Sequence, residues 1–285
     1  MFDRDLSFEE IASYRAVGVV YVRGAISPEW TQRMYDKIGA HMAGLGAFSG
    51  DTNPGSVTSR FVHDRYMWPT DPDFRAYAFE SGVAKLCAQA MGSRSARLYF
   101  DQIFVKEPET HERFFWHQDQ PYWPMGGTQI CSAWVTMTDV DAEASALEFV
   151  LGSDKLGKLY RPVMPEGTEQ DDSIQFINSG NDQPEIPDFD ADRAKNNIVS
   201  FDMKAGDALI FNTRIVHSSR GNASKTQRRL ALSTRWLGDD ATWKPRAGAD
   251  PIVAQEHVSI RSGFHWFTSS NTNRIRRVTW HCKVF

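Results

Sequence analysis

Two residues in the middle of the chain have the types and the spacing of metal ligands. His117 and Asp119 stand two positions apart within an aromatic-rich run over residues 115–123. On an extended strand, side chains two positions apart point to the same side, so the imidazole and the carboxylate are expected to converge. The pair alone is a weak signal, because 8 histidines and 36 acidic residues in 285 positions give about one such pair by chance.

A third candidate ligand follows a second strand-like segment. Residues 206–207 form a Gly-Asp turn dipeptide, residues 208–211 read as a short buried strand, and His217 comes soon afterwards. Two histidines and one carboxylate on one face of a metal, with the other positions open, form the facial triad of non-haem Fe(II) oxygenases. We therefore predict that His117, Asp119 and His217 bind one metal ion.

An arginine pair follows the third ligand. Arg228 stands 11 residues after His217, and its two-pronged guanidinium is suited to holding a carboxylate. Arg228 and Arg229 are neighbours at the start of a predicted strand, so their side chains face opposite sides and only one can enter the interior. A buried arginine is costly without an acidic partner, and a bound carboxylate would supply one.

Taken together, these residues resemble the phytanoyl-CoA dioxygenase family of Fe(II)- and 2-oxoglutarate-dependent oxygenases. The similarity covers roughly residues 95–240, in the stretches 101–108, 116–123, 131–134, 146–153, 206–211 and 217–229. Two family motifs are changed here: Asn-Gly-Ala/Cys-Leu is replaced by Ala-Ser-Ala-Leu at 144–147, and Pro-Gly-Ser/Thr-His by Leu-Gly-Ser-Asp at 151–154. Both lie away from the predicted ligands.

The resemblance implies a role for each residue at a matching position. Fe(II) is expected on the three predicted ligands, with 2-oxoglutarate and O2 as cosubstrates. The family's arginine after the distal histidine, which binds the far carboxylate of 2-oxoglutarate, corresponds to Arg228, and its helper serine corresponds to Ser219. Arg229 is then expected to meet solvent or an outer helix. Trp134 occupies the family's Ala-Trp position beside the cosubstrate.

Three further residues are candidates for substrate contact. Gln102, Tyr122 and Trp123 lie on or beside the segments that carry the metal motif. The alternative for each is ordinary core packing.

Composition limits the class of protein. With 285 residues and 41% hydrophobic content, the chain can build one substantial core, and we expect a single domain over 1–285. A net charge of −4 and a pI near 6.1 give no basic field for nucleic acid or an anionic membrane. No secretory signal and no membrane-length apolar stretch is found, and three cysteines without metal-type spacing favour a reducing cytoplasm. The expected partner is a small molecule, with the oligomeric state left open.

The expected fold is mainly β with flanking helices (α+β). Capping signals at Ser7 and Ser27 predict two early helices, and the pattern over 74–91 predicts a third. Short strands are predicted at 18–24, 97–106, 130–138, 146–151, 198–201, 208–211 and 229–237. This order indicates a helical part over about 1–95, a double-stranded β-helix (jelly-roll or cupin-like) core over about 96–240 and an extension over about 241–285. The polar segment 162–200 is either a surface excursion or a lid.

The predicted activity is hydroxylation of an unactivated C–H bond in a small metabolite, with release of succinate and CO2. A desaturase, epimerase or ring-forming variant would use the same site, and the iron ligands do not separate these outcomes. A Zn(II) or Mn(II) cupin-like hydrolase or isomerase would need the three ligands but no arginine. A catalytically silent binding protein would need neither.

Overall fold

The first helix begins where the sequence provides a cap. The computed structural model describes residues 4–162, 182–244 and 282–283. Helix α1 (Phe8–Val17) follows Ser7, whose side chain accepts the Glu10 N–H while the Glu10 carboxylate accepts the Ser7 N–H. This reciprocal capping box is the one predicted from the sequence.

The second helix also follows its predicted cap. Helix α2 (Pro28–His41) begins after Ser27, whose hydroxyl accepts the Trp30 N–H, and has proline in its first turn. Its apolar stripe is centred on Met34 and Ile38, which are fully buried.

The third predicted helix is two helices. The structure has α3 (Pro72–Glu80) and α4 (Val83–Met91), so the prediction of one helix over 74–91 is wrong. Gly82 between them has φ +92°, a left-handed conformation that ends the first helix and redirects the chain. The break lets both helices bury their apolar faces against the same sheet.

The larger of two facing sheets has eight strands in the described residues. Its order is β1-β10-β7-β12-β4-β3-β2, and β14 also pairs with β4. The strands are β1 (Val19–Val22), β2 (Gly50–Asp51), β3 (Phe61–Arg65), β4 (Ser95–Lys106), β7 (Ile130–Thr136), β10 (Ala208–Asn212), β12 (Arg229–Leu237) and β14 (Cys282–Lys283). Every pairing is antiparallel.

The smaller sheet has the order β5-β11-β8-β9 and is also antiparallel. Its strands are β5 (Phe114–His117), β8 (Leu147–Val150), β9 (Ile198–Ser200) and β11 (His217–Ser219). A separate two-stranded ribbon pairs β6 (Met125–Gly126) with β13 (Thr242–Trp243), and two 3-10 turns, η1 (Gln120–Tyr122) and η2 (Ser153–Lys155), complete the elements.

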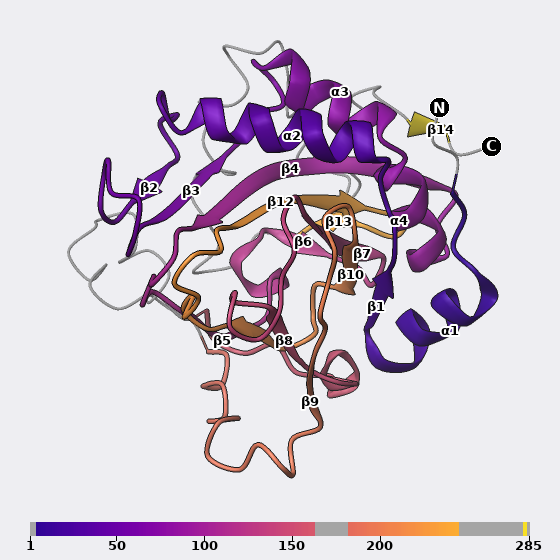
Figure 1. Cartoon of the computed structure of the whole chain (residues 1–285). Coiled ribbons are helices and arrows are strands. Elements are labelled where there is room, and N and C mark those ends of the chain that lie inside the picture. The colour runs from indigo at the N-terminus through magenta and orange to yellow at the C-terminus, as the bar shows by residue number, and fades with distance from the viewer. Residues whose placement is uncertain (1–3, 163–181, 245–281, 284–285) are drawn as a thin grey trace.

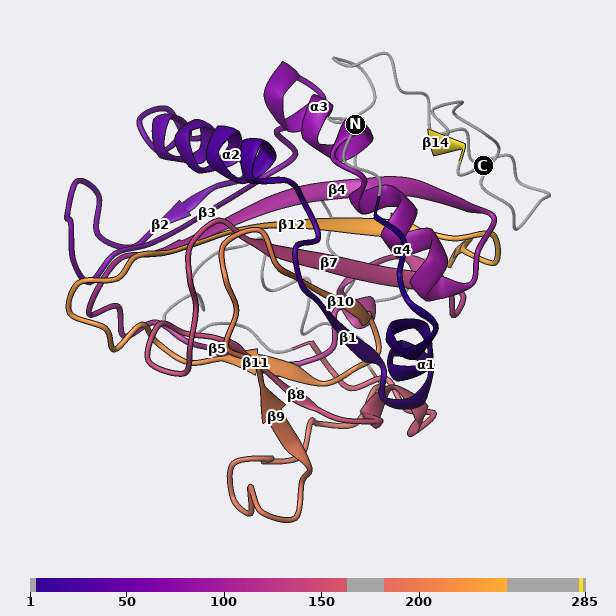
Figure 2. The same cartoon turned by 45° about the vertical axis from the view of Figure 1, so that its right-hand side comes forward.

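These elements form three layers. Helices α2, α3 and α4 lie over one face of the larger sheet, and the smaller sheet lies under the other (Figures 1 and 2). Strand β12 shows the division, because Leu230, Leu232 and Trp236 belong to the core under the helices while Ala231 belongs to the core between the sheets. This is the predicted jelly-roll architecture, and the site lies between its two sheets.

The expected boundary near residue 95 is not a boundary of the sheet. Strands β1, β2 and β3 come from the N-terminal part and complete the larger sheet on both sides. Their residues were expected to be mainly helical, and only the strand at β1 was predicted. Within the described ranges, no helix has both the length and the apolar character needed to cross a bilayer.

Replacement of Gly82 tests the account of the helix break. Gly82→Ala forces an L side chain into a left-handed backbone conformation, and we expect a loss of stability of about 1 kcal/mol. Chemical denaturation measures this. Gly39→Ala is the matched control, since Gly39 lies within α2 with open space around its Cα, and it should be neutral or stabilising. Equal effects of the two substitutions would contradict the account.

Candidate metal centre

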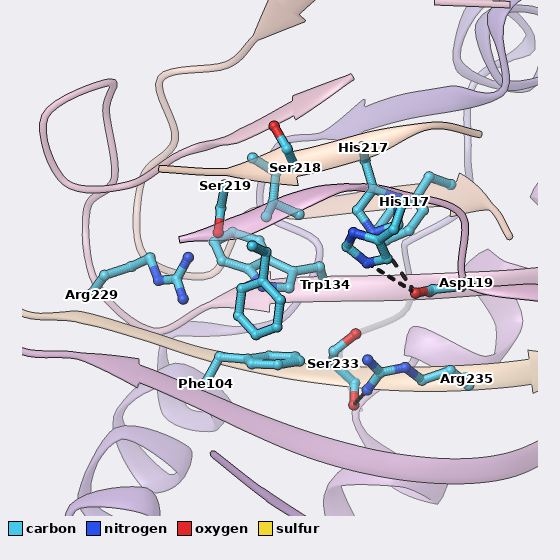
Figure 3. A pocket seen from close by; sticks show the side chains of 13 residues that line it. Phe104, His117, Asp119, Trp134, His217, Ser218, Ser219, Arg229, Ser233 and Arg235 are labelled. Atoms are coloured by element: carbon cyan, nitrogen blue, oxygen red, sulfur yellow. Dashed lines mark hydrogen bonds and ion pairs between the residues drawn. The ribbon is translucent and has the colours of Figure 1, made fainter. Parts of the chain in front are cut away.

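The three predicted ligands converge at the inner face of the smaller sheet. The candidate ligand atoms of His117, Asp119 and His217 all lie within 4.8 Å of one another. Asp119 Oδ1 is 3.7 Å from His117 Nε2 and 3.8 Å from His217 Nε2, and the two imidazole rings are 4.2 Å apart (Figure 3). This spacing fits three ligands around one ion, and no other such group of His, Cys, Asp or Glu occurs in the described ranges.

Strand pairing places the two histidines together. His117 ends β5 and is the direct partner of His217 at the start of β11. The aspartate reaches the same point by another route, because Asp119 has φ −70° and ψ −43° and begins the turn into η1. The prediction that the two residues share one extended strand is therefore wrong in its geometry, although their convergence is confirmed.

Two glutamines fix the turn that carries Asp119. Gln118 donates its side-chain amide to the carbonyl of Arg214 at 2.6 Å, and its carbonyl accepts the Tyr160 N–H at 2.9 Å. The Gln120 backbone N–H donates to the Thr213 carbonyl at 2.9 Å. The contacts with Thr213 and Arg214 tie this turn to the segment that leads into His217, and so they hold Asp119 close to that histidine.

Hydrogen bonds orient each of the three candidate ligands. His117 Nδ1 lies 2.7 Å from the carbonyl oxygen of Phe115, and His217 Nδ1 lies 3.1 Å from that of Ile215. Each carbonyl accepts a hydrogen bond from the Nδ1–H, which leaves Nε2 with its lone pair toward the cluster. The Ser132 hydroxyl donates to Asp119 Oδ2 at 2.6 Å and so orients the carboxylate.

Burial and nearby charges keep His217 and Asp119 in the protonation states that bind a metal ion. Burial, with the nearby His117, lowers the pKa of His217 to about 3, so its imidazole is neutral at physiological pH. Burial acts to raise the pKa of Asp119, but His217, Arg235 and His117 outweigh it, and the net shift is downward. A neutral imidazole and an ionised carboxylate are the states that bind a divalent ion.

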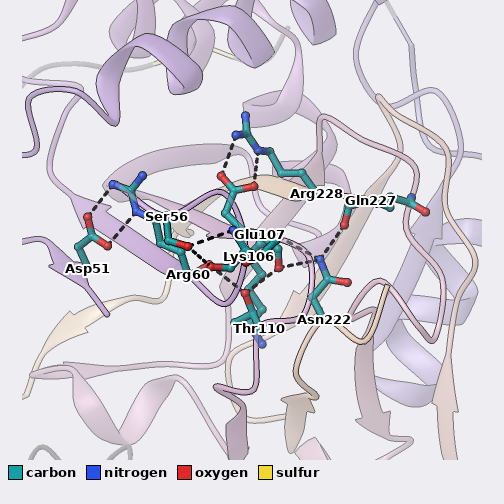
Figure 4. Close-up of polar contacts among 10 residues, drawn as sticks. Asp51, Ser56, Arg60, Lys106, Glu107, Thr110, Asn222, Gln227 and Arg228 are labelled. Carbon is teal, nitrogen blue, oxygen red and sulfur yellow. Dashed lines mark hydrogen bonds and ion pairs between the residues drawn. The ribbon is translucent and has the colours of Figure 1, made fainter. Parts of the chain in front are cut away.

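The arginine that reaches the pocket is Arg229. It is 1% exposed and lines the same cavity as the triad, together with Trp134 and Ser219 (Figure 3). Arg228 instead lies outside the barrel, where it forms an ion pair of 2.7 Å with Glu107 (Figure 4). The prediction that Arg228 enters the interior while Arg229 faces outward is therefore wrong.

The reason lies in the register of β12. Strand β12 begins at Arg229, which pairs with Lys106 on β4, so alternation directs Arg229 inward. Asn222 fixes this end of the strand, because its side-chain amide donates to the carbonyls of Lys106, Glu107 and Gln227 (Figure 4).

A second buried cation lies beside Arg229. Lys106 is fully buried and donates from Nζ to Ser145 Oγ and Ser219 Oγ, both at 3.2 Å, and to the carbonyl of Arg220. Burial, with the positive charge of Arg229, lowers the pKa of Lys106 well below its usual value. Arg229 donates to Ser145 oxygens at 3.1 and 3.3 Å, while its Nε has no partner.

Neither cation has an acidic partner within 4.0 Å among the residues that the structure describes. Two buried cations without an acid form a site that favours a bound anion. Arg229 lies at one end of the cavity and the triad lies further along it (Figure 3). A molecule with a carboxylate at one end and metal-binding oxygens at the other therefore fits the arrangement.

The walls of the cavity are mostly aromatic. The Arg229 guanidinium lies 5.6 Å from the Trp134 ring, and Phe104, Phe114, Leu147 and Phe211 complete the apolar lining. The space is about 420 Å³ including its open mouth. Trp134 and Ser219 thus lie where the sequence expectation placed them, beside the predicted cosubstrate position.

The three substrate-contact candidates lie around the cavity and are not among its lining residues. Gln102 shares the inward face of β4 with Phe104 and is paired with Ser233. The Tyr122 ring is 6.0 Å from the His117 ring. Trp123 packs in an aromatic cluster with Tyr99 and Phe100 at 5.5 and 5.6 Å.

Sequence reasoning missed four polar residues of this site. Arg229 and Arg235 occupy the inward face of β12, Lys106 that of β4, and Ser132 supports Asp119. One signal was available: Lys106 continues the same-face series of Phe100, Gln102 and Phe104, and a lysine on an apolar face is unusual.

Comparison with known proteins identifies the family. The profile of phytanoyl-CoA dioxygenase (PhyH) matches residues 14–230, more than half of the chain, and the chain belongs to this family. No curated protein sequence matches the chain.

Solved structures share the fold at low sequence identity. The carbocyclase SnoK from nogalamycin biosynthesis has a TM-score of 0.68 at 21% identity, over 89% of this chain and 90% of that one. The epimerase SnoN, in a complex with Fe3+, alpha ketoglutarate and nogalamycin RO, has 0.63 at 22%, over 83% and 85%. EctD from S. alaskensis, with 2-oxoglutarate and 5-hydroxyectoine, has 0.63 at 15%, over 84% and 78%.

Removal of one ligand tests the metal site. His217→Ala takes away a buried donor that no neighbouring side chain replaces, and we expect the affinity for Mn(II), an O2-stable probe, to fall by about 100-fold or more. Anaerobic titration calorimetry measures this, and His111→Ala, at an exposed histidine, should keep the wild-type affinity. Wild-type affinity in His217→Ala would place the metal elsewhere.

Proposed function

We propose that the protein is an Fe(II)- and 2-oxoglutarate-dependent oxygenase that oxidises an unactivated C–H bond of a small molecule and releases succinate and CO2. The observation that carries this proposal is a two-histidine, one-carboxylate cluster that shares a cavity with the buried Arg229. Membership of the PhyH family and the Fe- and 2-oxoglutarate-bound neighbours support it.

The donor set suits Fe(II). Three protein ligands on one side leave open positions for a bidentate keto acid and for O2. When bound, iron and 2-oxoglutarate supply the oxidising chemistry, in which O2 converts the keto acid to succinate and CO2. The protein supplies ligation, orientation and a dry cavity.

Each residue of the chain has a defined task in this proposal. Arg229 holds the far carboxylate of 2-oxoglutarate, because it is buried, charged and without an acidic partner. Ser219 and Lys106, joined by a 3.2 Å hydrogen bond, lie beside that carboxylate. Trp134 forms the wall against which the cosubstrate's carbon chain packs. These assignments replace the one made for Arg228.

The buried cations also weigh against the alternative classes. A Zn(II) or Mn(II) hydrolase with the same ligands has no need for Arg229 beside Lys106, and a buried cation pair costs free energy when nothing binds it. A silent binding protein would have no reason to hold two histidines and a carboxylate within 4.8 Å of one another.

Hydroxylation is the specific reaction that we propose for this oxygenase. It would be the outcome if the cavity holds the reacting C–H bond of the substrate close to the candidate iron site. Gln102, Tyr122 and Trp123 remain our candidates for substrate contact. We place the enzyme in a reducing cytoplasm, supported by the free, buried thiols of Cys87 and Cys131, and we assign the activity to one domain.

Paired arginine substitutions test the cosubstrate site. Arg229→Gln removes a buried charge-assisted contact worth roughly 2–5 kcal/mol, so we expect 2-oxoglutarate to bind the anaerobic Fe(II) protein about 30-fold or more weakly. The visible charge-transfer absorption of the Fe(II)–keto acid complex reports the affinity.

Arg228→Gln is the matched control, because Arg228 forms an ion pair with Glu107 and does not line the cavity. Its 2-oxoglutarate affinity should stay within about twofold of wild type, since the substitution removes no group that faces the cosubstrate. The reverse ranking of the two variants would show that the arginine assignment is wrong.

The reaction type is tested with isotopically labelled O2. A metabolite that stimulates succinate formation should yield a product heavier by one labelled oxygen atom, with one labelled oxygen atom in succinate. A product with unchanged mass would indicate epimerisation, and a product lighter by two hydrogen atoms would indicate desaturation or ring formation. Either result would contradict hydroxylation. Failure to form succinate with any metabolite would count against the oxygenase itself.

A further inference from the structure

A second buried arginine faces the cavity at its other end. Arg235 stands six residues after Arg229 on the same face of β12, which separates their Cα atoms by roughly 20 Å. It is 5% exposed and lines the cavity with the triad. Figure 3 shows Arg229 and Arg235 at opposite ends of the pocket, with Asp119 above Arg235.

Two aromatic rings pack against the Arg235 guanidinium and leave N–H groups at its edge free to bind a ligand. It lies 4.7 Å from the Phe100 ring and 5.6 Å from the Phe104 ring. Within the described residues it makes one hydrogen bond, from Nη1 to the Ser233 carbonyl at 3.2 Å, and its Nε has no partner. Stacked on aromatic rings, an arginine keeps its planar N–H fork available for an oxyanion.

No acid in the described part of the chain forms an ion pair with Arg235. Asp119 and Arg235 attract each other electrostatically. The Asp119 carboxylate, however, accepts a hydrogen bond from Ser132 and points toward the two histidines. Asp101 is on the opposite face of β4, where it accepts the Trp68 N–H at 3.0 Å. Arg65 adds a further positive charge on the neighbouring β3 strand.

Cosubstrate loading does not remove this excess of positive charge. Arg229 and Arg235 carry two positive charges along the cavity wall against one negative charge on Asp119. A divalent metal and the 2-oxoglutarate dianion cancel each other, so one positive charge remains, before Lys106 is considered. Four C–C bonds of ~1.5 Å each separate the two carboxylates of 2-oxoglutarate by roughly 5 Å in extended form. The far carboxylate, held at Arg229, is therefore not the group that would meet Arg235.

We propose that Arg235 binds a carboxylate of the substrate, and that the enzyme therefore acts on a small organic acid whose oxidised carbon lies close to that carboxylate. The inference rests on the proposed function and adds the substrate class. Gln102, which pairs with Ser233 on the neighbouring β4, remains a candidate for contact with the same substrate. The near carboxylate of 2-oxoglutarate is the other source of the same chemistry, and the experiment separates the two.

The test uses the anaerobic Fe(II)–2-oxoglutarate complex and a panel of monocarboxylates. Acetate, butyrate, hexanoate, octanoate and phenylacetate are each compared with the corresponding amide, and the change in the charge-transfer absorption is recorded. We expect at least one acid to perturb the absorption at a concentration at least tenfold lower than its amide. In Arg235→Gln this acid response should weaken at least tenfold, with 2-oxoglutarate affinity within about twofold of wild type.

A conservative variant separates charge from geometry. Arg235→Lys should recover part of the acid response, because it keeps the charge and loses the fork, and thermal melting confirms that each variant is folded. Equal responses to acids and amides, or no response to any acid, would overturn the proposal. A loss of 2-oxoglutarate affinity in Arg235→Gln as large as in Arg229→Gln would assign Arg235 to the cosubstrate instead. Absence of the absorption in the wild-type protein would count against the proposed function itself.

Discussion

The antiparallel pairing of β5 with β11 is the constraint on which the site depends. It sets His117 opposite His217, so two ligands that are 100 positions apart in the chain become neighbours across one strand pair. The glutamine-anchored turn after β5 then brings Asp119 to the same point. A shift of one residue in this pairing would turn one imidazole to the other face of the sheet and separate the ligands.

The larger sheet contributes the opposite wall and most of the charge. Its outward residues pack beneath the helices, whereas its inward residues include Lys106, Arg229 and Arg235. Burial of Arg229 and Arg235 in an aromatic cavity is unfavourable for folding alone, and bound anions would offset that cost. The larger sheet thus carries the buried arginines, and the smaller sheet carries the two histidines of the candidate metal centre.

Sequence patterns predicted the features that depend on local chemistry. The capping box of α1 and the β-rich core follow from residue types and short spacing, and the structure confirms both. The structure also brings His117, Asp119 and His217 together, as predicted for ligands of one metal ion. The arginine assignment failed because it depends on where β12 begins, and that is set by pairing with β4 and by Asn222, far apart in the chain. The helix over 74–91 failed because a single glycine conformation at Gly82 outweighs helical periodicity.

The crystal structure of the protein with Fe(II) and N-oxalylglycine, an unreactive analogue of 2-oxoglutarate, tests the central claim most directly. The account predicts one metal ion at ~2.0–2.2 Å from His117 Nε2, His217 Nε2 and an Asp119 oxygen, with the far carboxylate of the analogue on Arg229 and Ser219. A metal bound elsewhere, or the far carboxylate bound by Arg228 outside the barrel, would contradict it.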